Sequence, residues 1–168
     1  MVAFLHVGFL CGARTGEIMS LEWDSIDFEN NLITISTSMR KGILGVTKTD
    51  QVRIVPMVKR LSEALLKWKS TARTKYVFPI PNKGVPYKDS RSIVDSKFKP
   101  MLKQLNIPYK LLYSTRHTFA SLAVEHGVSV SIVSQCLGHN NISTTQRFYI
   151  RMGNLDFENS RAALEKLA

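Results

Sequence analysis

The sequence predicts an α+β fold that is mainly α-helical, with a small antiparallel β-sheet at one edge of the molecule. Helical apolar periodicity runs through both ends of the chain, whereas short β-branched, alternating segments are confined to residues 32–56. The 168 residues suffice for a hydrophobic core, and no repeat or low-complexity tract divides them. Residues 1–168 are therefore expected to form a single domain.

The first third of the chain predicts two helices followed by strands. Residues 2–11 are almost entirely apolar and Gly12 follows them, which predicts a buried helix with a glycine stop. Thr15 is expected to cap a short second helix that has an acidic residue in its first turn. The alternating LITIS, residues 32–36, predicts a strand. Two further short strands are expected at 46–49 and 51–56.

The rest of the chain predicts helices joined by polar loops. Residues 58–70 repeat apolar side chains at helical spacing, and a loop rich in proline and glycine follows. Further helices are expected at about 90–105, 114–126, 129–137, 143–149 and 157–167. In the helix at 114–126, Ser114 is the expected N-cap. The expected buried face of that helix consists of Phe119, Ala120, Leu122 and Ala123.

The charge of the chain is concentrated in its middle. The net charge of +10 comes from 23 basic and 13 acidic residues. Residues 39–110 hold seventeen of the basic and four of the acidic residues. A basic segment of this size favours a polyanionic partner, most commonly nucleic acid, over a merely solvated lysine-rich face.

Composition also narrows the location of the chain. No apolar run approaches the ~18 residues of a membrane span, and the opening segment lacks the basic start of a signal peptide. Two cysteines, Cys11 and Cys136, give no disulfide framework, which suits a reducing compartment. A cytoplasmic protein that does not enter membranes is therefore expected.

Two arginines, Arg14 and Arg116, occupy positions that packing of a hydrophobic core does not explain. Arg14 lies between the expected stop of the first helix and the cap of the second, where pairing with Glu17 is its simplest role. Arg116 lies in the first turn of a predicted helix, where the helix dipole disfavours a cation. A bound anion would offset that cost, and two arginines can grip one phosphate.

His139 follows Gly138 just past a predicted helix and is expected to be exposed on a loop. Cys136 and His139 have the spacing of half a zinc site, but the sequence contains no second pair of ligands at such a spacing. No metal and no other cofactor is therefore expected. Tyr149, taken alone, predicts a half-buried aromatic residue that closes a helix.

Together, four segments resemble the catalytic domain of the tyrosine recombinases, the phage-integrase family, over about residues 5–150. In order, the segments are ARTGEIMSLEWDSID, TKTDQVRIVP, RHTFAS and LGHNNISTTQRFY. The resemblance implies the fold of the DNA breaking–rejoining enzymes and a site-specific recombinase or integrase of a phage or mobile element. The catalytic residues that it implies are Arg14, Lys48, Arg116, His139 and the nucleophile Tyr149, with Glu17 in support.

The resemblance also implies how the chain works with DNA. Members of this family act on double-stranded DNA as homotetramers whose C-terminal tails, here 150–168, are exchanged between subunits. One position departs from the pattern, because the family usually has histidine where this chain has Tyr113. The chain also begins inside the first recognisable helix, so an N-terminally truncated catalytic domain is expected.

Two other classes of protein remain open at this point. One is a type IB topoisomerase-like enzyme, which would form the same covalent intermediate without recombination. The other is a DNA-binding remnant without catalysis, because VSVSIVSQCLGH resembles a helix-turn-helix segment. A covalent protein–DNA adduct would separate an enzyme from such a remnant.

Overall fold

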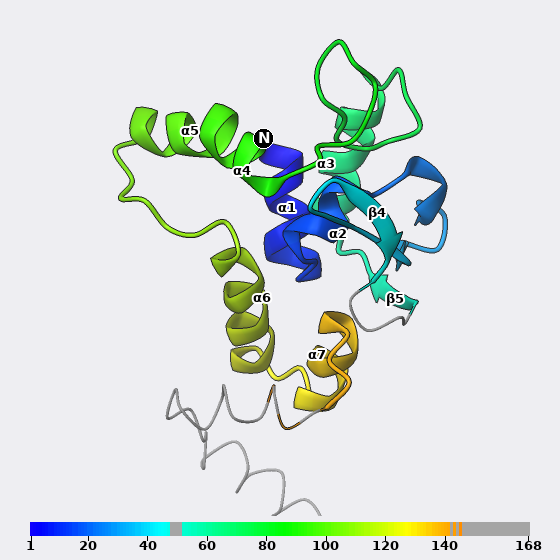
Figure 1. Ribbon diagram of the computed structural model, residues 1–168. Helices are drawn as coiled ribbons and strands as arrows, with labels where there is room; N and C mark the ends of the chain where they lie inside the picture. The colour runs from blue at the N-terminus through cyan, green and yellow to red at the C-terminus, as the bar shows by residue number, and fades with distance from the viewer. Residues whose placement is uncertain (48–51, 142, 144, 146–168) are drawn as a thin grey trace, which may run out of the picture.

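A computed structural model describes residues 1–47, 52–141, 143 and 145, and it confirms the mainly helical α+β fold (Figure 1). The helices are α1 (Val2–Cys11), α2 (Thr15–Met19), α3 (Lys59–Lys69), α4 (Ser90–Ile93), α5 (Lys99–Gln104), α6 (Ser114–Glu125) and α7 (Val130–Leu137). A 3-10 turn, Trp23–Ser25, follows α2, and a π-helical turn, Val94–Phe98, joins α4 to α5 into one continuous run. Among the described residues, no helix has both the length and the hydropathy that crossing a membrane requires.

The strands form two small antiparallel sheets. They are β1 (Ile26–Asp27), β2 (Leu32–Ile35), β3 (Thr37–Arg40), β4 (Ile43–Val46) and β5 (Arg53–Pro56). One sheet has the order β1-β2-β5, and β3 pairs with β4 in a separate hairpin. In the first sheet Ile33 lies opposite Val55, and Ile35 lies opposite Arg53.

The predicted pair of strands at 46–49 and 51–56 is only partly right. The first strand, β4, ends at Val46 and pairs with β3. The sequence did not predict β3, because TSMR lacks β-branched alternation. The second strand begins at Arg53 and pairs with β2. Residues 48–51, between the two strands, lie outside the described residues.

The helix α1 occupies the middle of the structure and packs against both α3 and α6 (Figure 1). Its buried residues include Phe4, Val7 and Cys11. A helix that is apolar on all sides belongs in a core, so the prediction from residues 2–11 is confirmed. Gly12 ends α1 with a φ of 65°, a left-handed conformation that glycine adopts without steric cost.

The helix α6 forms where the sequence predicts it, and most of its predicted buried face is confirmed, because Ala120 is buried and the partly buried Phe119 and Ala123 pack against the same cluster. Thr115, Arg116 and Ala120 are its buried residues, whereas Leu122 is 47% exposed and is wrongly assigned to the buried face. Ser114 is likewise the first residue of the helix and not its N-cap, which is Tyr113. Thr115 and Arg116 extend this buried face into the first turn of the helix.

Candidate active site

The first site element is the junction of α1 and α2, where Arg14 stands as the N-cap of α2. The Arg14 backbone N–H donates to Glu17 Oε2 at 2.7 Å, and its Nη1 donates to Glu17 Oε1 at 2.8 Å. The predicted pairing of these two residues is therefore confirmed. Thr15, the predicted cap, is instead the first helical residue, and the Glu17 carboxylate satisfies the backbone at this helix start.

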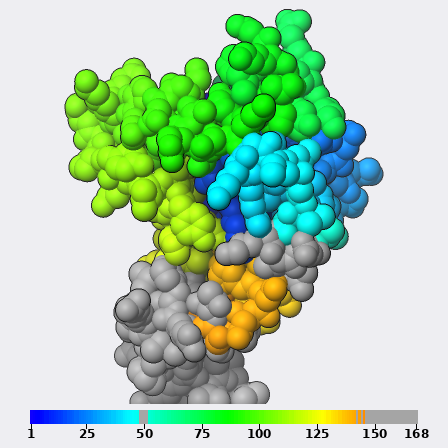
Figure 2. Space-filling view, in the orientation of Figure 1, coloured from blue at the N-terminus to red at the C-terminus, as the bar shows by residue number. Residues whose placement is uncertain are grey.

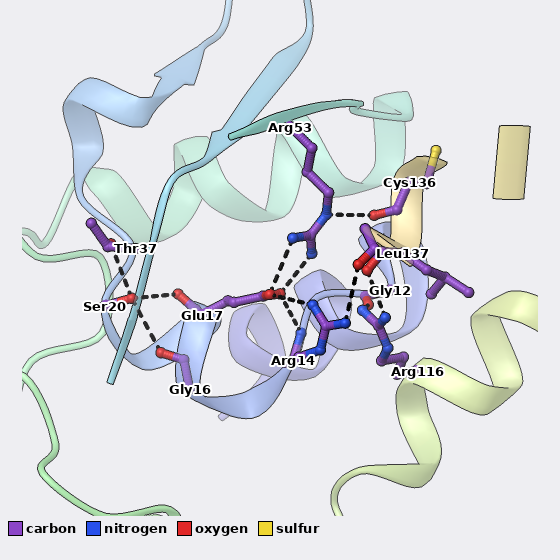
Figure 3. A network of polar contacts seen from close by, with 11 residues as sticks. Gly12, Arg14, Gly16, Glu17, Ser20, Thr37, Arg53, Arg116, Cys136 and Leu137 are labelled. Atoms are coloured by element: carbon purple, nitrogen blue, oxygen red, sulfur yellow. Dashed lines mark hydrogen bonds and ion pairs between the residues drawn. The ribbon is translucent and has the colours of Figure 1, made fainter. Parts of the chain in front are cut away.

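The Glu17 carboxylate is buried, with 2% of the residue exposed, and it binds a second arginine. Arg53 Nη1 and Nη2 donate to Glu17 Oε1 and Oε2 at 3.1 Å and 2.6 Å, in a two-pronged ion pair (Figure 3). Burial alone would raise the pKa of Glu17, but the hydrogen bonds and charge of Arg53, followed by those of Arg14, bring it below its ordinary value. Glu17 is therefore ionised at neutral pH and fixes both guanidinium groups.

Three successive carbonyl groups at the C-terminal end of α7 each accept a hydrogen bond from a different arginine. The bonds run from Arg53 Nε to Cys136 O (2.7 Å), from Arg116 Nη2 to Leu137 O (2.6 Å) and from Arg14 Nη2 to Gly138 O (3.2 Å). Carbonyls at a helix C-terminus lack helical partners and carry the negative end of the dipole. This three-arginine cluster, Arg14, Arg53 and Arg116, thus joins α2, β5 and α6 to the end of α7 (Figure 3).

Arg116 also contacts the end of a second helix. Its Nη1 donates to the carbonyl oxygen of Gly12, the C-cap of α1, at 2.7 Å. From the sequence, a bound anion was expected to offset the cost of placing Arg116 in the first turn of a helix. In the structure, carbonyl groups at the C-terminal ends of α1 and α7 offset that cost. Burial, followed by the like charge of Arg14, lowers the pKa of Arg116 from 12.5 to about 10, so it stays cationic at neutral pH. A guanidinium has more N–H donors than these two contacts use, so a phosphate can bind without breaking them.

His139 lies on the loop after α7, as predicted, but it is half-buried and not exposed. Its Nδ1 lies 2.7 Å from the hydroxyl of Thr145, which holds the ring in place. Burial, followed by the charges of Arg116 and Arg14, lowers the pKa of His139 from 6.5 to about 4. The imidazole is therefore neutral at neutral pH and can offer one N–H and one lone pair.

The low pKa of His139 predicts a pH-dependent stability. In the unfolded chain the imidazole binds a proton near pH 6.5, whereas in the folded protein it does so only near pH 4. The free energy of unfolding should therefore fall as the pH drops from 6.5 toward 4, by about 1 kcal/mol after allowance for solvent screening of a half-exposed group.

The matched variant is His139→Gln, which keeps a polar side chain beside Thr145 but cannot titrate. Urea unfolding of both proteins between pH 7 and pH 5 should show a steeper loss of stability in the parent chain. Glu17 does not interfere, because its lowered pKa places its own loss of stability at more acidic pH. Equal slopes for the two proteins would show that His139 is not held neutral.

Tyr113 lies beside the cluster at the start of α6 and is 45% exposed. Its ring meets the ring of His117 edge to face, with centroids 5.0 Å apart. His117 was not among the predicted site residues, although its position directly after Arg116 and four residues after Tyr113 placed it on the same helical face. Although Tyr113 stands where the family usually has histidine, the imidazole of His117 thus lies next to the phenol.

A cavity of about 670 Å³ opens beside these residues. Its lining residues come from α2, β3, α4, α5 and the segment before α6, and they include Arg14, Arg40, Arg91, Lys99 and Tyr113. Figure 2 shows blue atoms near the start of the chain exposed in a recess between the cyan hairpin and the yellow-green segment that leads into α6. The lining thus carries four cationic side chains and two acidic ones, Asp89 and Asp95, and Asp95 pairs with Lys99.

The structure brings Arg14, Glu17, Arg116 and His139 together and places Tyr113 at the edge of the group. Lys48 and Tyr149 lie outside the described residues. Arg53 was not among the predicted site residues. Its signal in the sequence is the alternation along β5, which places Arg53 on the same face as the buried Val55, while Ile54 on the other face is 60% exposed. Among the described residues, no three His, Cys, Asp or Glu side chains cluster as metal ligands would.

The comparisons with known proteins agree with this fold. The profile of the Phage integrase family matches residues 2–160, and the chain belongs to this family. It is 27% identical over 173 residues to "Tyrosine recombinase XerC-like" of Caldanaerobacter subterraneus, covering 88% of this chain and 44% of that protein. It is 30% identical to "Tyrosine recombinase XerC" of Lacticaseibacillus casei, covering 93% of this chain and 52% of that protein. The chain thus spans about half the length of these relatives.

Solved structures show the same fold. The Tn1549 transposon integrase in complex with circular intermediate DNA superposes with a TM-score of 0.78 at 24% identity, over 99% of this chain and 59% of that chain. The XerA recombinase superposes with a TM-score of 0.70 at 25% identity, over 98% of this chain and 56% of that chain. The predicted family and fold are confirmed.

Proposed function

We propose that this chain is the catalytic part of a site-specific DNA recombinase that cuts and rejoins DNA through a 3′-phosphotyrosine. The observation that carries the proposal is the convergence of Arg14 and Arg116 with His139 around the C-terminal end of α7. Two cations and a neutral imidazole in one place form a binding site for a single phosphodiester.

A phosphodiester resists attack because its charge repels nucleophiles and its alkoxide leaving group is poor. Arg14 and Arg116 would bind the nonbridging oxygens and stabilise the charge that grows in the transition state. Their fixed positions mean that little reorganisation is needed when the reaction occurs. His139, held by Thr145, would donate a further hydrogen bond to the same phosphate through its other ring nitrogen.

The two reacting groups are assigned from the family resemblance. The Tyr149 hydroxyl attacks phosphorus and gives its proton to water, and the P–O bond to the 5′ oxygen breaks. Lys48 protonates that oxygen as general acid, which leaves a free 5′ hydroxyl. The reverse reaction, with a 5′ hydroxyl from another strand, rejoins DNA without ATP or metal, because the phosphotyrosine stores the bond energy.

The cavity beside Arg14 and Tyr113 has more cationic than acidic lining residues, which suits the backbone of double-stranded DNA on either side of the reacting phosphate. Binding should therefore weaken steeply with salt. The segment 150–168 would be exchanged between subunits of a homotetramer on DNA. The setting would be the cytoplasm of a bacterium or phage-infected cell, at the nucleoid, with a phage or mobile element as the DNA substrate.

The direct test is trapping on a nicked suicide substrate. When the strand is nicked close to the cleavage site, the short 5′-hydroxyl product diffuses away and rejoining is prevented. The expected result is a protein–DNA adduct that survives denaturing electrophoresis. A protein that binds the same DNA but never forms the adduct would be a DNA-binding remnant, and the proposed function would be wrong.

Tyr113 gives a graded prediction for the same assay. A phenol can donate a hydrogen bond to the phosphate but accepts a proton poorly at neutral pH, whereas an imidazole accepts one readily. We expect Tyr113→Phe to slow cleavage about tenfold, the size of one lost hydrogen bond. We expect Tyr113→His to match or exceed the parent rate.

Single-turnover cleavage rates across pH 6–8 check both variants. A Tyr113→Phe rate equal to that of the parent would leave the phenol as packing against His117 only. An inactive but folded Tyr113→His would show that the pocket depends on the phenol itself.

A further inference from the structure

Arg53 is a buried cation that the proposed chemistry does not use. Only 8% of the residue is exposed, and the cavity beside Arg14 and Tyr113 is lined by other side chains. Buried charge is costly unless it is paired, and apolar residues of similar volume are often as stable or more so. Its neighbour on the same face of β5 is the fully buried Val55, so packing alone does not require an arginine at this position.

The contacts of Arg53 lie directly behind the phosphate-binding group. Its two terminal nitrogens hold both oxygens of Glu17, the carboxylate that also binds Arg14 through Nη1 and the backbone N–H. Its Nε holds the carbonyl of Cys136, the first of the three successive carbonyls that end α7. One rigid guanidinium therefore fixes the partner of Arg14 and the helix end that precedes His139 (Figure 3).

The packing around Arg53 leaves it little freedom. Gly138 approaches so closely that a Cβ on it would lie 3.0 Å from Arg53 Cδ, and its φ of 63° is left-handed. Glycine therefore lets the α7 end close over the Arg53 side chain, in a conformation that other residues adopt only with strain. A shift of Arg53 would be transmitted to Glu17 and to the α7 end together.

We infer that Arg53 is a positioning residue for strand cleavage, which sets Arg14 through Glu17 and sets the α7 end that leads into His139. The inference rests on the proposed function, because it assigns Arg53 a part in that reaction without contact with DNA. Lys48 stands five residues before Arg53 in the sequence, so action through the leaving-group acid is the alternative that a test must separate.

Three variants test the inference on the full chain. Arg53→Met keeps the length of the side chain but removes the charge and all donors. Arg53→Lys keeps the charge but cannot hold Glu17 and Cys136 at once, and it serves if Arg53→Met does not fold. Arg73→Met makes the same change at an exposed arginine in the loop after α3 and is the matched control.

The first readout is the cleavage rate at saturating DNA, measured beside the dissociation constant. A misplacement of about 1 Å costs on the order of a hundredfold in rate. We expect about that loss for Arg53→Met, about tenfold for Arg53→Lys and none for Arg73→Met, with DNA affinity unchanged in all three. Cleavage by both Arg53 variants at the parent rate would overturn the inference, as would a loss that DNA affinity alone explains.

A second substrate separates the two routes of action. With sulfur in place of the bridging 5′ oxygen, the leaving group departs without protonation, because a thiol is far more acidic than an alcohol. A defect that acts through Arg14 persists on this substrate. A defect that disappears would place Arg53 behind the general acid and overturn the route through Glu17 and α7.

A third readout does not depend on activity. In an NMR titration, the pKa of His139 should rise toward its ordinary value in Arg53→Met, and its resonance should shift in Arg53→Lys, with His126 at the far end of α6 as reference. An unchanged His139 in folded variants would overturn the inference. If the parent chain forms no adduct but the Arg53 variants still show these His139 changes, the proposed function is refuted while the structural role of Arg53 stands.

Discussion

Replacing Tyr149 by phenylalanine is expected to abolish the covalent protein–DNA adduct while leaving DNA affinity close to that of the parent chain. The substitution removes only the attacking oxygen. The groups proposed to bind the phosphate, Arg14, Arg116 and His139, are untouched, so the DNA complex should still form. Electrophoresis of the trapped reaction and a binding titration on the same DNA measure the two quantities.

The control for this variant is Tyr113→Phe, which removes a phenolic oxygen beside Arg116 and should slow the adduct without abolishing it. An adduct that persists in Tyr149→Phe would identify another residue as the nucleophile. Loss of DNA binding in Tyr149→Phe would instead mean that the hydroxyl supports the fold, and the assignment of its role would have to change.

Replacing Glu17 by alanine is expected to lower the free energy of unfolding by about 3–5 kcal/mol. The carboxylate is the shared partner of Arg53 and Arg14, and its loss leaves the buried guanidinium of Arg53 without a counter-charge. Since domains are stable by only about 5–15 kcal/mol, this is a large part of the total. Urea denaturation at pH 7 measures the change.

Glu63→Ala on α3 is the matched control. Glu63 also pairs with a cation, Lys59, but the side chains are 92% and 64% exposed for Lys59 and Glu63, and their charged atoms are 4.0 Å apart. Exposed pairs of this kind contribute little. Equal effects of the two substitutions would mean that burial of Glu17 and Arg53 is not the source of the stability assigned to them.

The sequence predicted the elements whose pattern is local. Residues 2–11, 32–36, 58–70 and 129–137 form the expected helices and strand, because an apolar face or a β-branched run requires no distant partner. The motifs around Arg14, Arg116 and His139 also indicated which side chains would meet. The ion pair between Arg14 and Glu17 follows from their spacing along one short helix.

Features that depend on distant contacts could not be predicted in the same way. Burial of Arg53 depends on Glu17 and on Cys136, which are 36 and 83 residues away along the chain. Burial of Arg116 likewise depends on the carbonyl of Gly12, 104 residues before it. Alternation along β5 can place Arg53 on the buried face, but the partners of Arg53 and of Arg116 depend on where helix ends meet in three dimensions, which no local pattern predicts.

The most direct measurement is to identify the residue and the DNA end that are joined in the trapped adduct. Protease digestion and mass spectrometry locate the linked peptide, and end-labelled strands show which side of the break carries the protein. The expected result is a 3′ phosphate joined to Tyr149 and a free 5′ hydroxyl on the released strand. A linkage through a 5′ phosphate, or to any residue other than Tyr149, would contradict the proposed mechanism.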